Sequence, residues 1–364
     1  EDLPDLSSKV NPKDVSRAIE LSKTEWNMWE SSFEFSGVKF EGKSFYESFK
    51  LFHEETTRII NELHTLENII SANVTKDLNV SIELRDVDLE SISLESNCSL
   101  LELQSKWAAQ LISYVIGCIM GRYSIINEGI MFASKKQNHF FEKVNEGAFS
   151  NFFPDDDGII PLTDQEWFKD DATNRFREFV QVVSGEAHLQ ENLDFVAESL
   201  CLNAIKPKKS ELALEAIRRY LSTQFYKDHL KTYKKRPIYW LFSSGKQKAF
   251  ECLVYLHRYN EGTLSRMRTE YVTPLLGKYD AYAEQLEKQI ETADSTIEAN
   301  RFKKELDALI KKQVELREFD DKLKHYADMR ISLDLDDGVK VNYGKFGDLL
   351  ADVKAITGSA PEVN

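Results

Sequence analysis

Residues 234–246 read KKRPIYWLFSSGK, a short run that combines cations, aromatic rings and hydroxyl groups. Because Pro237 cannot continue the helical pattern that precedes it, the apolar residues 238–242 are predicted to form a buried strand. The following SSGK sequence at 243–246 predicts a turn. Residues 250–259 then form either the second strand of a hairpin or a helix, and we favour the strand.

The charge around this run differs from that of the rest of the chain. Residues 206–248 contain 12 Lys and Arg against three Asp and Glu, a local charge of +9 in a chain of net charge −14. Cations bind phosphates, while aromatic faces and short polar side chains meet bases, so this mixture indicates a nucleic-acid interface. The acidic stretches at 83–102 and 155–171 are interpreted as solvated faces or protein-binding surfaces.

The candidate DNA-binding residues lie in this basic segment and in the two stretches that follow it. For the aromatic residues the competing interpretation is a core strand, and for the cations it is a solvated surface. Arg258, Arg266 and Arg268 extend the same face if the chain doubles back as a hairpin. The complete set is Lys231, Lys234, Lys235, Arg236, Tyr239, Trp240, Ser243, Ser244, Lys246, Lys248, His257, Arg258, Arg266 and Arg268.

The chain as a whole is expected to fold into more than one domain. Its 364 residues and 42% hydrophobic content are enough for a sizeable core, and helical periodicity prevails along most of its length. The predicted fold class is α+β and predominantly α-helical, with a small antiparallel β element. The predicted domains are a helical connector at 1–75, a mainly helical domain at 76–205, a basic recognition segment with a β-hairpin at 206–275, and a long helical hairpin with a terminal helix at 276–364.

Apolar periodicity and capping residues predict the individual helices. Alternating apolar residues at 76–90 predict a short strand or extended arm instead. Thr163 or Asp164 is the expected N-cap of the fourth helix, and Gly185 its end. The predicted helices span 13–33, 44–72, 99–120, 165–183, 188–203 and 210–233, followed by an antiparallel pair of long helices between 263 and 330 and a last helix near 343–356.

No catalytic or metal-binding motif is found. The SGK sequence at 244–246 lacks the earlier glycine and the following Ser or Thr of a phosphate-binding loop. The DLDDG sequence at 334–338 differs from a calcium loop because its glycine comes one position early, and Lys345 occupies the place of the closing glutamate. The seven histidines lack metal-ligand spacing. An independent enzyme therefore has little support.

The cellular setting is inferred from the cysteines and from apolar segments. The four cysteines are far apart and form no Cys-x-x-Cys pair, which favours a reducing, cytoplasmic compartment. The longest apolar stretch, 111–120, is about half of the roughly 20 residues that a membrane span needs. The chain opens without methionine or a signal peptide, which suggests a fragment or a processed product.

Short segments spread in order along the chain carry a family resemblance. They read TEW at 24–26, WESSFEF at 29–35, ISY at 112–114, GRYS at 121–124, IPLTD at 160–164, EWF at 166–168, NRFREF at 174–179, the run at 234–246, YLHRY at 255–259 and LDLDDGVKVNY at 333–343. Together they resemble the C-terminal part of the PglX (BrxX) family, the adenine-specific DNA methyltransferases of bacterial BREX phage-defence systems.

This resemblance implies a catalytic core, outside the chain, that uses S-adenosylmethionine to methylate adenine N6 and so marks host DNA. The chain itself lacks the glycine-rich turn and the Asn/Asp-Pro-Pro-aromatic turn of such a core, so no catalytic or cofactor-binding residue is assigned to it. The implied role of this region is target recognition, placed on 236–248 and 257–258. The implied partners are double-stranded DNA and the N-terminal methyltransferase core, with no membrane.

A protein-interaction module is the alternative function. The long helices after 263 and the acidic N-terminal half would then dock other BREX proteins or an acidic phage inhibitor that mimics DNA. Such a mimic would select the same basic segment as DNA does.

Overall fold

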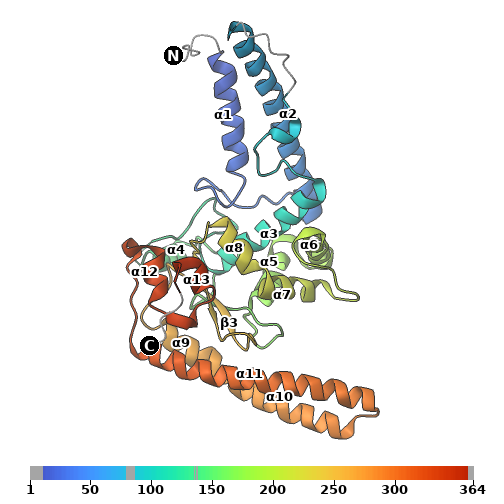
Figure 1. Ribbon diagram of the computed structural model, residues 1–364, viewed down its shortest axis with the longest axis vertical. Coiled ribbons are helices and arrows are strands. Elements are labelled where there is room, and N and C mark those ends of the chain that lie inside the picture. The colour runs from blue at the N-terminus through green and yellow to red at the C-terminus, as the bar shows by residue number, and fades with distance from the viewer. Residues whose placement is uncertain (1–10, 79–86, 135, 137, 360–364) are drawn as a thin grey trace. The chain divides into compact units, whose positions relative to one another are not determined.

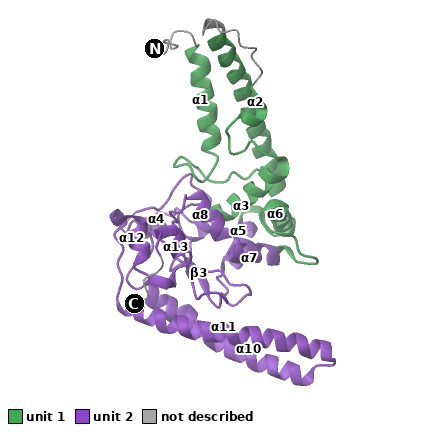
Figure 2. Ribbon diagram, in the orientation of Figure 1, with its two compact units in different colours: residues 1–114, 183–213 green, residues 115–182, 214–364 purple. Residues whose placement is uncertain are grey.

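The computed structural model describes residues 11–78, 87–134, 136 and 138–359 (Figure 1). The chain is predominantly helical and contains a small three-stranded antiparallel sheet, which confirms the predicted fold class. Two compact units are present (Figure 2). Unit 1 comprises residues 1–114 and 183–213, and unit 2 comprises residues 115–182 and 214–364, so each unit combines segments that are distant in sequence.

Unit 1 is built on the helices α1 (Pro12–Trp26) and α2 (Phe45–Leu78), which lie side by side. Leu21, Ile59 and Leu63 form the centre of their apolar interface. The predicted first helix was expected to reach 33, but it ends at Trp26, and turns occupy the residues that follow. Helix α2 runs past its predicted end into the expected strand at 76–90, of which residues 79–86 lie outside the described part of the chain.

Further helical elements belong to unit 1, and one of them, α3, continues past residue 114 into unit 2. The short 3-10 helices η1 (Leu89–Ser91) and η2 (Glu186–His188) precede α3 (Leu100–Ile119) and α6 (Leu189–Asn203). Asn192 fixes α6 to the start of α2, because its side chain accepts from the Phe45 N–H at 2.7 Å and donates to the Lys43 carbonyl at 2.8 Å. The predicted helices at 99–120 and 188–203 are thereby confirmed.

The sheet of unit 2 has the order β1-β3-β2 and is antiparallel throughout. Its strands are β1 (Ile159–Pro161), β2 (Tyr239–Ser243) and β3 (Glu251–Tyr255). The predicted hairpin is confirmed, with Trp240 opposite Val254. Almost every residue of the sheet is buried, so both of its faces are covered by other elements. The strand β1 was not predicted, because it is a three-residue edge strand that ends in proline.

The predicted pair of long helices is also confirmed, as α10 (Thr273–Thr292) and α11 (Thr296–Asp328) (Figure 1). The pair follows a single helical turn, α9 (Thr263–Arg266), and a π-helical segment, η3 (Met267–Val272). Ser295 caps α11 by accepting from the Glu298 N–H. Apolar residues of η3, α10 and α11 belong to the same hydrophobic core as β2 and β3.

Three other predicted helices differ from the structure. Helix α5 (Ala172–Ser184) begins seven residues later than expected, because Asp171 is the residue that accepts from the Asn174 N–H. The predicted helix at 210–233 is broken at Gln224 into α7 (Ala213–Thr223) and α8 (Phe225–Thr232). The predicted last helix near 343–356 is replaced by the end of α12 (Gly338–Gly344) and by two short turns, η5 (Gly347–Leu349) and α13 (Val353–Thr357). The 3-10 turn η4 (Leu335–Asp337) precedes them.

The remaining helix of the described chain is α4 (Asn138–Asn145). Within the described ranges, no helix is both long and apolar enough to cross a bilayer. In the same ranges, no three His, Cys, Asp or Glu side chains converge as metal ligands.

Gly117 of α3 lets two aromatic side chains of unit 2 approach the helix. A Cβ atom added at this position would lie 2.3 Å from Cδ2 of Tyr123 and 3.0 Å from the hydroxyl oxygen of Tyr239. Tyr239 is the first residue of β2. The absence of a side chain at Gly117 therefore sets how closely α3 packs against the hairpin.

Replacing Gly117 with alanine is expected to lower the free energy of unfolding by about 1–3 kcal/mol, because the buried Tyr123 ring has to move. Gly277→Ala is the matched control, since Gly277 is an exposed position of α10 where an added Cβ meets nothing within 4 Å. This control is expected to be stabilising by up to about 1 kcal/mol. Urea unfolding measures both, and equal stability of the two variants would contradict this account.

Candidate nucleic-acid interface

The aromatic residues of β2 lie in the hydrophobic core. Tyr239 and Trp240 are 0% and 1% exposed. The Trp240 indole donates to the Pro237 carbonyl at 3.0 Å and packs edge-on against Tyr343. The sequence left base stacking and core packing open for these residues, and the structure supports the core. Tyr239 and Trp240 are therefore corrected from candidate base contacts to buried residues, because no base can reach them in this fold.

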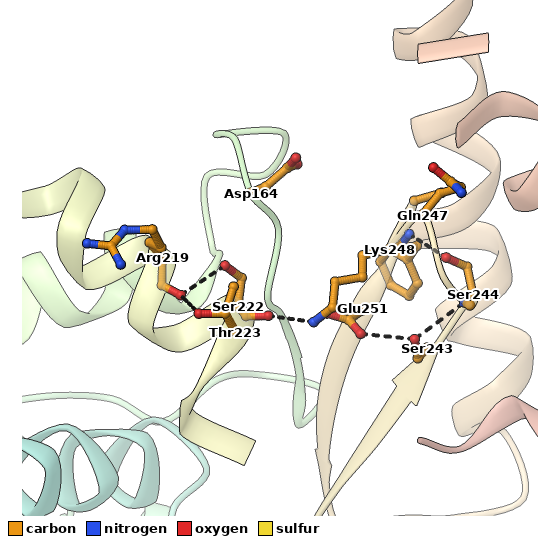
Figure 3. Close-up of polar contacts among 12 residues, drawn as sticks. Asp164, Arg219, Ser222, Thr223, Ser243, Ser244, Gln247, Lys248 and Glu251 are labelled. Carbon is orange, nitrogen blue, oxygen red and sulfur yellow. Dashed lines mark hydrogen bonds and ion pairs between the residues drawn. The ribbon is translucent and has the colours of Figure 1, made fainter. Parts of the chain in front are cut away.

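The two serines of the turn are occupied by internal hydrogen bonds (Figure 3). Ser243 Oγ donates to Glu251 Oε1 at 2.9 Å, and Ser244 Oγ donates to Glu315 Oε1 at 2.8 Å. Ser244 Oγ also accepts from the Phe250 N–H at 2.9 Å. Their hydroxyl groups thus close the turn instead of pointing toward a base.

Glu315 of α11 holds the turn against the long helix. Besides the Ser244 hydroxyl, its carboxylate accepts from the backbone N–H groups of Gln247 at 2.7 Å and Ala249 at 3.2 Å. Gly245 has a positive φ of 133°, and a Cβ atom there would lie 3.1 Å from Glu315 Oε2. The close approach of turn and helix therefore depends on glycine at this position.

Lys248 ties the other side of the turn to the end of α7 (Figure 3). Its Nζ donates to the Ser222 carbonyl at 2.7 Å and to Glu251 Oε2 at 2.9 Å. Glu251 is 4% exposed, and burial raises the pKa of its carboxyl group, opposed by the nearby Lys248. Lys248 is thus a structural cation rather than one available to phosphates.

The arginines predicted to extend the interface are also engaged. Arg258 is buried, donates to the carbonyls of Asp155 at 2.6 Å and Asp156 at 2.8 Å, and lies 4.2 Å from the Phe140 ring centroid. Arg268 forms a two-pronged ion pair with Asp320 of α11, at 2.8 and 2.9 Å. Arg266 is exposed and lies 3.4 Å from Glu270.

His257 lines a small pocket rather than an open face. The pocket has a volume of about 200 Å³, and Tyr259, Asn260 and Leu333 are among its other lining residues. The His257 ring is half-buried, and burial, with a smaller contribution from the charge of Arg122, lowers its pKa to about 4. It is therefore a neutral imidazole near neutral pH and offers no charge to a phosphate.

Five of the predicted cations remain exposed and form no ion pair within the described ranges. Lys246 lies in the hairpin turn, and the other four lie at the end of α8 and in the connection to β2. We call these four the basic loop: Lys231, Lys234, Lys235 and Arg236. The turn residues 245–248, all exposed, are the hairpin tip.

The backbone of the basic loop is fixed by hydrogen bonds. Lys234 and Lys235 both have left-handed conformations, with φ of 49° and 60°. The Lys235 N–H donates to the Leu230 carbonyl at 2.7 Å, and the Arg236 N–H donates to the Tyr233 carbonyl at 2.9 Å. The tight turn holds these three cations next to one another with their side chains exposed.

His229 anchors the far end of this loop, and the sequence analysis did not identify it. Its Nε2 accepts from the N–H groups of Ile238 at 3.1 Å and Tyr239 at 3.2 Å, and its ring packs against those of Tyr233 and Tyr239. Burial, aided by the charge of Arg122, lowers the pKa of His229 to about 3. The neutral imidazole thus holds the start of β2 in place through these two hydrogen bonds. The sequence signal that could have identified this anchor is a single histidine, His229, shortly before Pro237.

The basic segment predicted at 206–275 is divided between the two units. Its first residues, up to 213, belong to unit 1, whereas the basic loop and the hairpin tip belong to unit 2. Within unit 2 they flank the two ends of β2, whose five residues span roughly 16 Å at 3.3 Å per residue.

Comparison with known proteins finds two relatives that match most of this chain. The adenine-specific methyltransferase BrxX of Escherichia coli O9:H4 (strain HS) is 56% identical over 361 residues, which cover 95% of this chain and 30% of the relative. The adenine-specific methyltransferase PglX of Lacticaseibacillus casei (strain Zhang) is 36% identical over 315 residues, covering 86% of this chain and 23% of the relative. The chain thus spans less than a third of their length. No family model matches it.

Replacing His229 with glutamine is expected to flatten the pH dependence of the unfolding free energy between about pH 6.5 and pH 3. In this window the unfolded wild type binds a proton near its ordinary pKa of 6.5 while folded His229 stays neutral, so stability falls as the pH falls. The slope attributable to this one group is at most about 1.4 kcal/mol per pH unit. Glutamine cannot titrate, and its amide oxygen still accepts from the two N–H groups.

Urea unfolding at a series of pH values measures this difference. His325→Gln, an exposed position of α11, is the control, and His257 titrates unchanged in all three proteins. Parallel pH profiles for the wild type and His229→Gln would show that His229 does not titrate as a buried neutral group.

Proposed function

We propose that this chain, which belongs to the PglX (BrxX) family of adenine-specific methyltransferases as one region of a longer protein, holds and recognises the DNA that is methylated. The N6 methylation of adenine, and the marking of host DNA in BREX phage defence, are then the work of the full-length protein. The observation that carries this proposal is the basic loop, four exposed cations without ion pairs among the described residues of an acidic chain.

The basic loop suits a phosphate backbone. Three of its cations follow one another in a turn whose backbone is hydrogen-bonded internally, so binding has to order only their side chains. Each phosphate that they neutralise releases condensed counterions, which favours association and makes it depend on salt. Such contacts fix the position of the duplex and carry no sequence information themselves.

Two observations support placing the S-adenosylmethionine site outside this chain. Its eight prolines are never adjacent, so the aromatic turn that grips a flipped adenine is absent from this sequence. The pocket beside His257, at about 200 Å³, is smaller than the roughly 300–1,000 Å³ of typical cofactor sites. We therefore place methyl transfer in the part of the full-length protein outside this chain and derive no catalytic step here.

Protein docking is the second candidate function, and unit 1 favours it. Ile19, Trp26 and Phe33 are 63%, 47% and 95% exposed, and the first two lie seven residues apart on one side of α1. Exposed apolar residues in such an arrangement are typical of protein-binding surfaces. The methyltransferase core of the full-length protein is the partner that we propose for this side of α1, ahead of other BREX proteins or a phage inhibitor.

Removing three charges from the basic loop is expected to weaken DNA binding for all sequences alike. The suitable variant is Lys234→Asn/Lys235→Asn/Arg236→Gln, because asparagine tolerates the left-handed conformation of the two lysines. The slope of log affinity against log salt is expected to fall in magnitude by up to about 2.7, or about 0.9 for each phosphate that is no longer neutralised. Fluorescence anisotropy of a labelled duplex, with the full-length protein over a salt series, measures this.

The matched control removes the same charge elsewhere in unit 2. Lys169→Gln/Lys340→Gln/Lys354→Gln changes three exposed lysines outside the basic loop. If the two triple variants show the same decrease in affinity and slope, the effect comes from net charge and the assignment of the basic loop is wrong.

A further inference from the structure

The hairpin tip presents two free polar side chains. Of its four residues, Gly245 has no side chain, and the Lys248 ammonium is bound to Ser222 and Glu251. Lys246 and Gln247 are exposed, and within the described ranges neither side chain forms a hydrogen bond or ion pair. Gln247 takes part in the internal network through its backbone N–H alone, and its side-chain amide extends away from the neighbouring groups (Figure 3).

The backbone beneath these two side chains is held from several directions. Glu315 binds the N–H groups of Gln247 and Ala249, and the Lys248 N–H donates to the Gly245 carbonyl at 3.2 Å. The Ser244 N–H donates to the Phe250 carbonyl at 2.9 Å. A ligand that binds at the tip therefore has to order the side chains but not the turn, which lowers the entropic cost of a specific contact.

We propose that Gln247 reads an adenine of the target sequence in the major groove, while Lys246 contacts an adjacent phosphate. This inference rests on the proposed function and names the residue that supplies sequence specificity. A glutamine amide has one donor and one acceptor side by side, which matches N7 and the N6 amino group of adenine. Both of these adenine groups are displayed in the major groove, which is about 12 Å wide.

The position of the tip relative to the basic loop agrees with this role. The two lie beyond opposite ends of β2, a strand that itself spans roughly 16 Å. At 3.4 Å per base pair this corresponds to about five base pairs. The basic loop can thus bind the phosphates of one segment of the duplex while Gln247 reads a base about half a helical turn away.

The direct test is selection of a randomised duplex pool by the full-length protein, followed by sequencing of the bound DNA. The wild type is expected to enrich a motif, and Gln247→Ala to lose discrimination at one A·T pair by roughly 5- to 150-fold. The salt slope is expected to stay unchanged, because no phosphate contact is removed. Gln285→Ala, an exposed glutamine of α10, is the matched control and retains the wild-type motif.

Two further variants separate base reading from a general loss of affinity. Gln247→Glu is expected to shift the preference at that position from adenine to cytosine, because a carboxylate accepts from the cytosine N4 amino group. Glu315→Ala frees the turn and is expected to reduce discrimination at the same position although Gln247 is intact. Its salt slope should equal that of the wild type.

The outcomes distinguish this inference from the proposed function. If the wild type enriches a motif and Gln247→Ala enriches the same motif with equal discrimination, the proposed function stands and the role of Gln247 is refuted. If DNA binding by the wild type depends on salt but no motif is enriched, base reading by the hairpin tip is again refuted. Absence of any salt-dependent DNA binding by the wild type overturns both.

Discussion

The rest of unit 2 depends on one constraint, which is that the β2–β3 hairpin is buried on both faces. The polar groups of a buried strand pair need partners within the protein, and other elements supply them at its ends. Glu315 of α11 binds the N–H groups of the turn, and His229 of α8 binds those at the start of β2. The same contacts that satisfy the hairpin also make its two ends rigid.

Rigidity at both ends gives the free side chains there a defined position. Several cations near the hairpin are engaged within the fold, as when Arg268 binds Asp320 and Lys248 binds Glu251. The cations of the basic loop and Lys246 are exposed and form no ion pair within the described ranges. In a chain of net charge −14 such a local group directs an anionic ligand to one place without attracting it to the whole surface.

The sequence was sufficient for the elements with strong local signals. Pro237 followed by an apolar run identified β2, and uninterrupted periodicity identified the long helical pair. The sequence could not show which cations are engaged within the fold, because partners such as Asp320 for Arg268 are distant in sequence. Arg258 binds carbonyls about a hundred residues away, and Glu315 closes a turn from another element. The burial of Tyr239 and Trp240 has the same origin, since the helices that cover them come from both sides of the hairpin in sequence.

DNA is expected to contact the basic loop and the hairpin tip. Chemical acylation of lysine amines in the full-length protein, with and without duplex DNA and read by mass spectrometry, measures this contact. DNA is expected to protect Lys231, Lys234, Lys235 and Lys246, while the exposed lysines Lys169, Lys340 and Lys354 react as before. Unchanged reactivity of the first group at saturating DNA would show that DNA binds elsewhere.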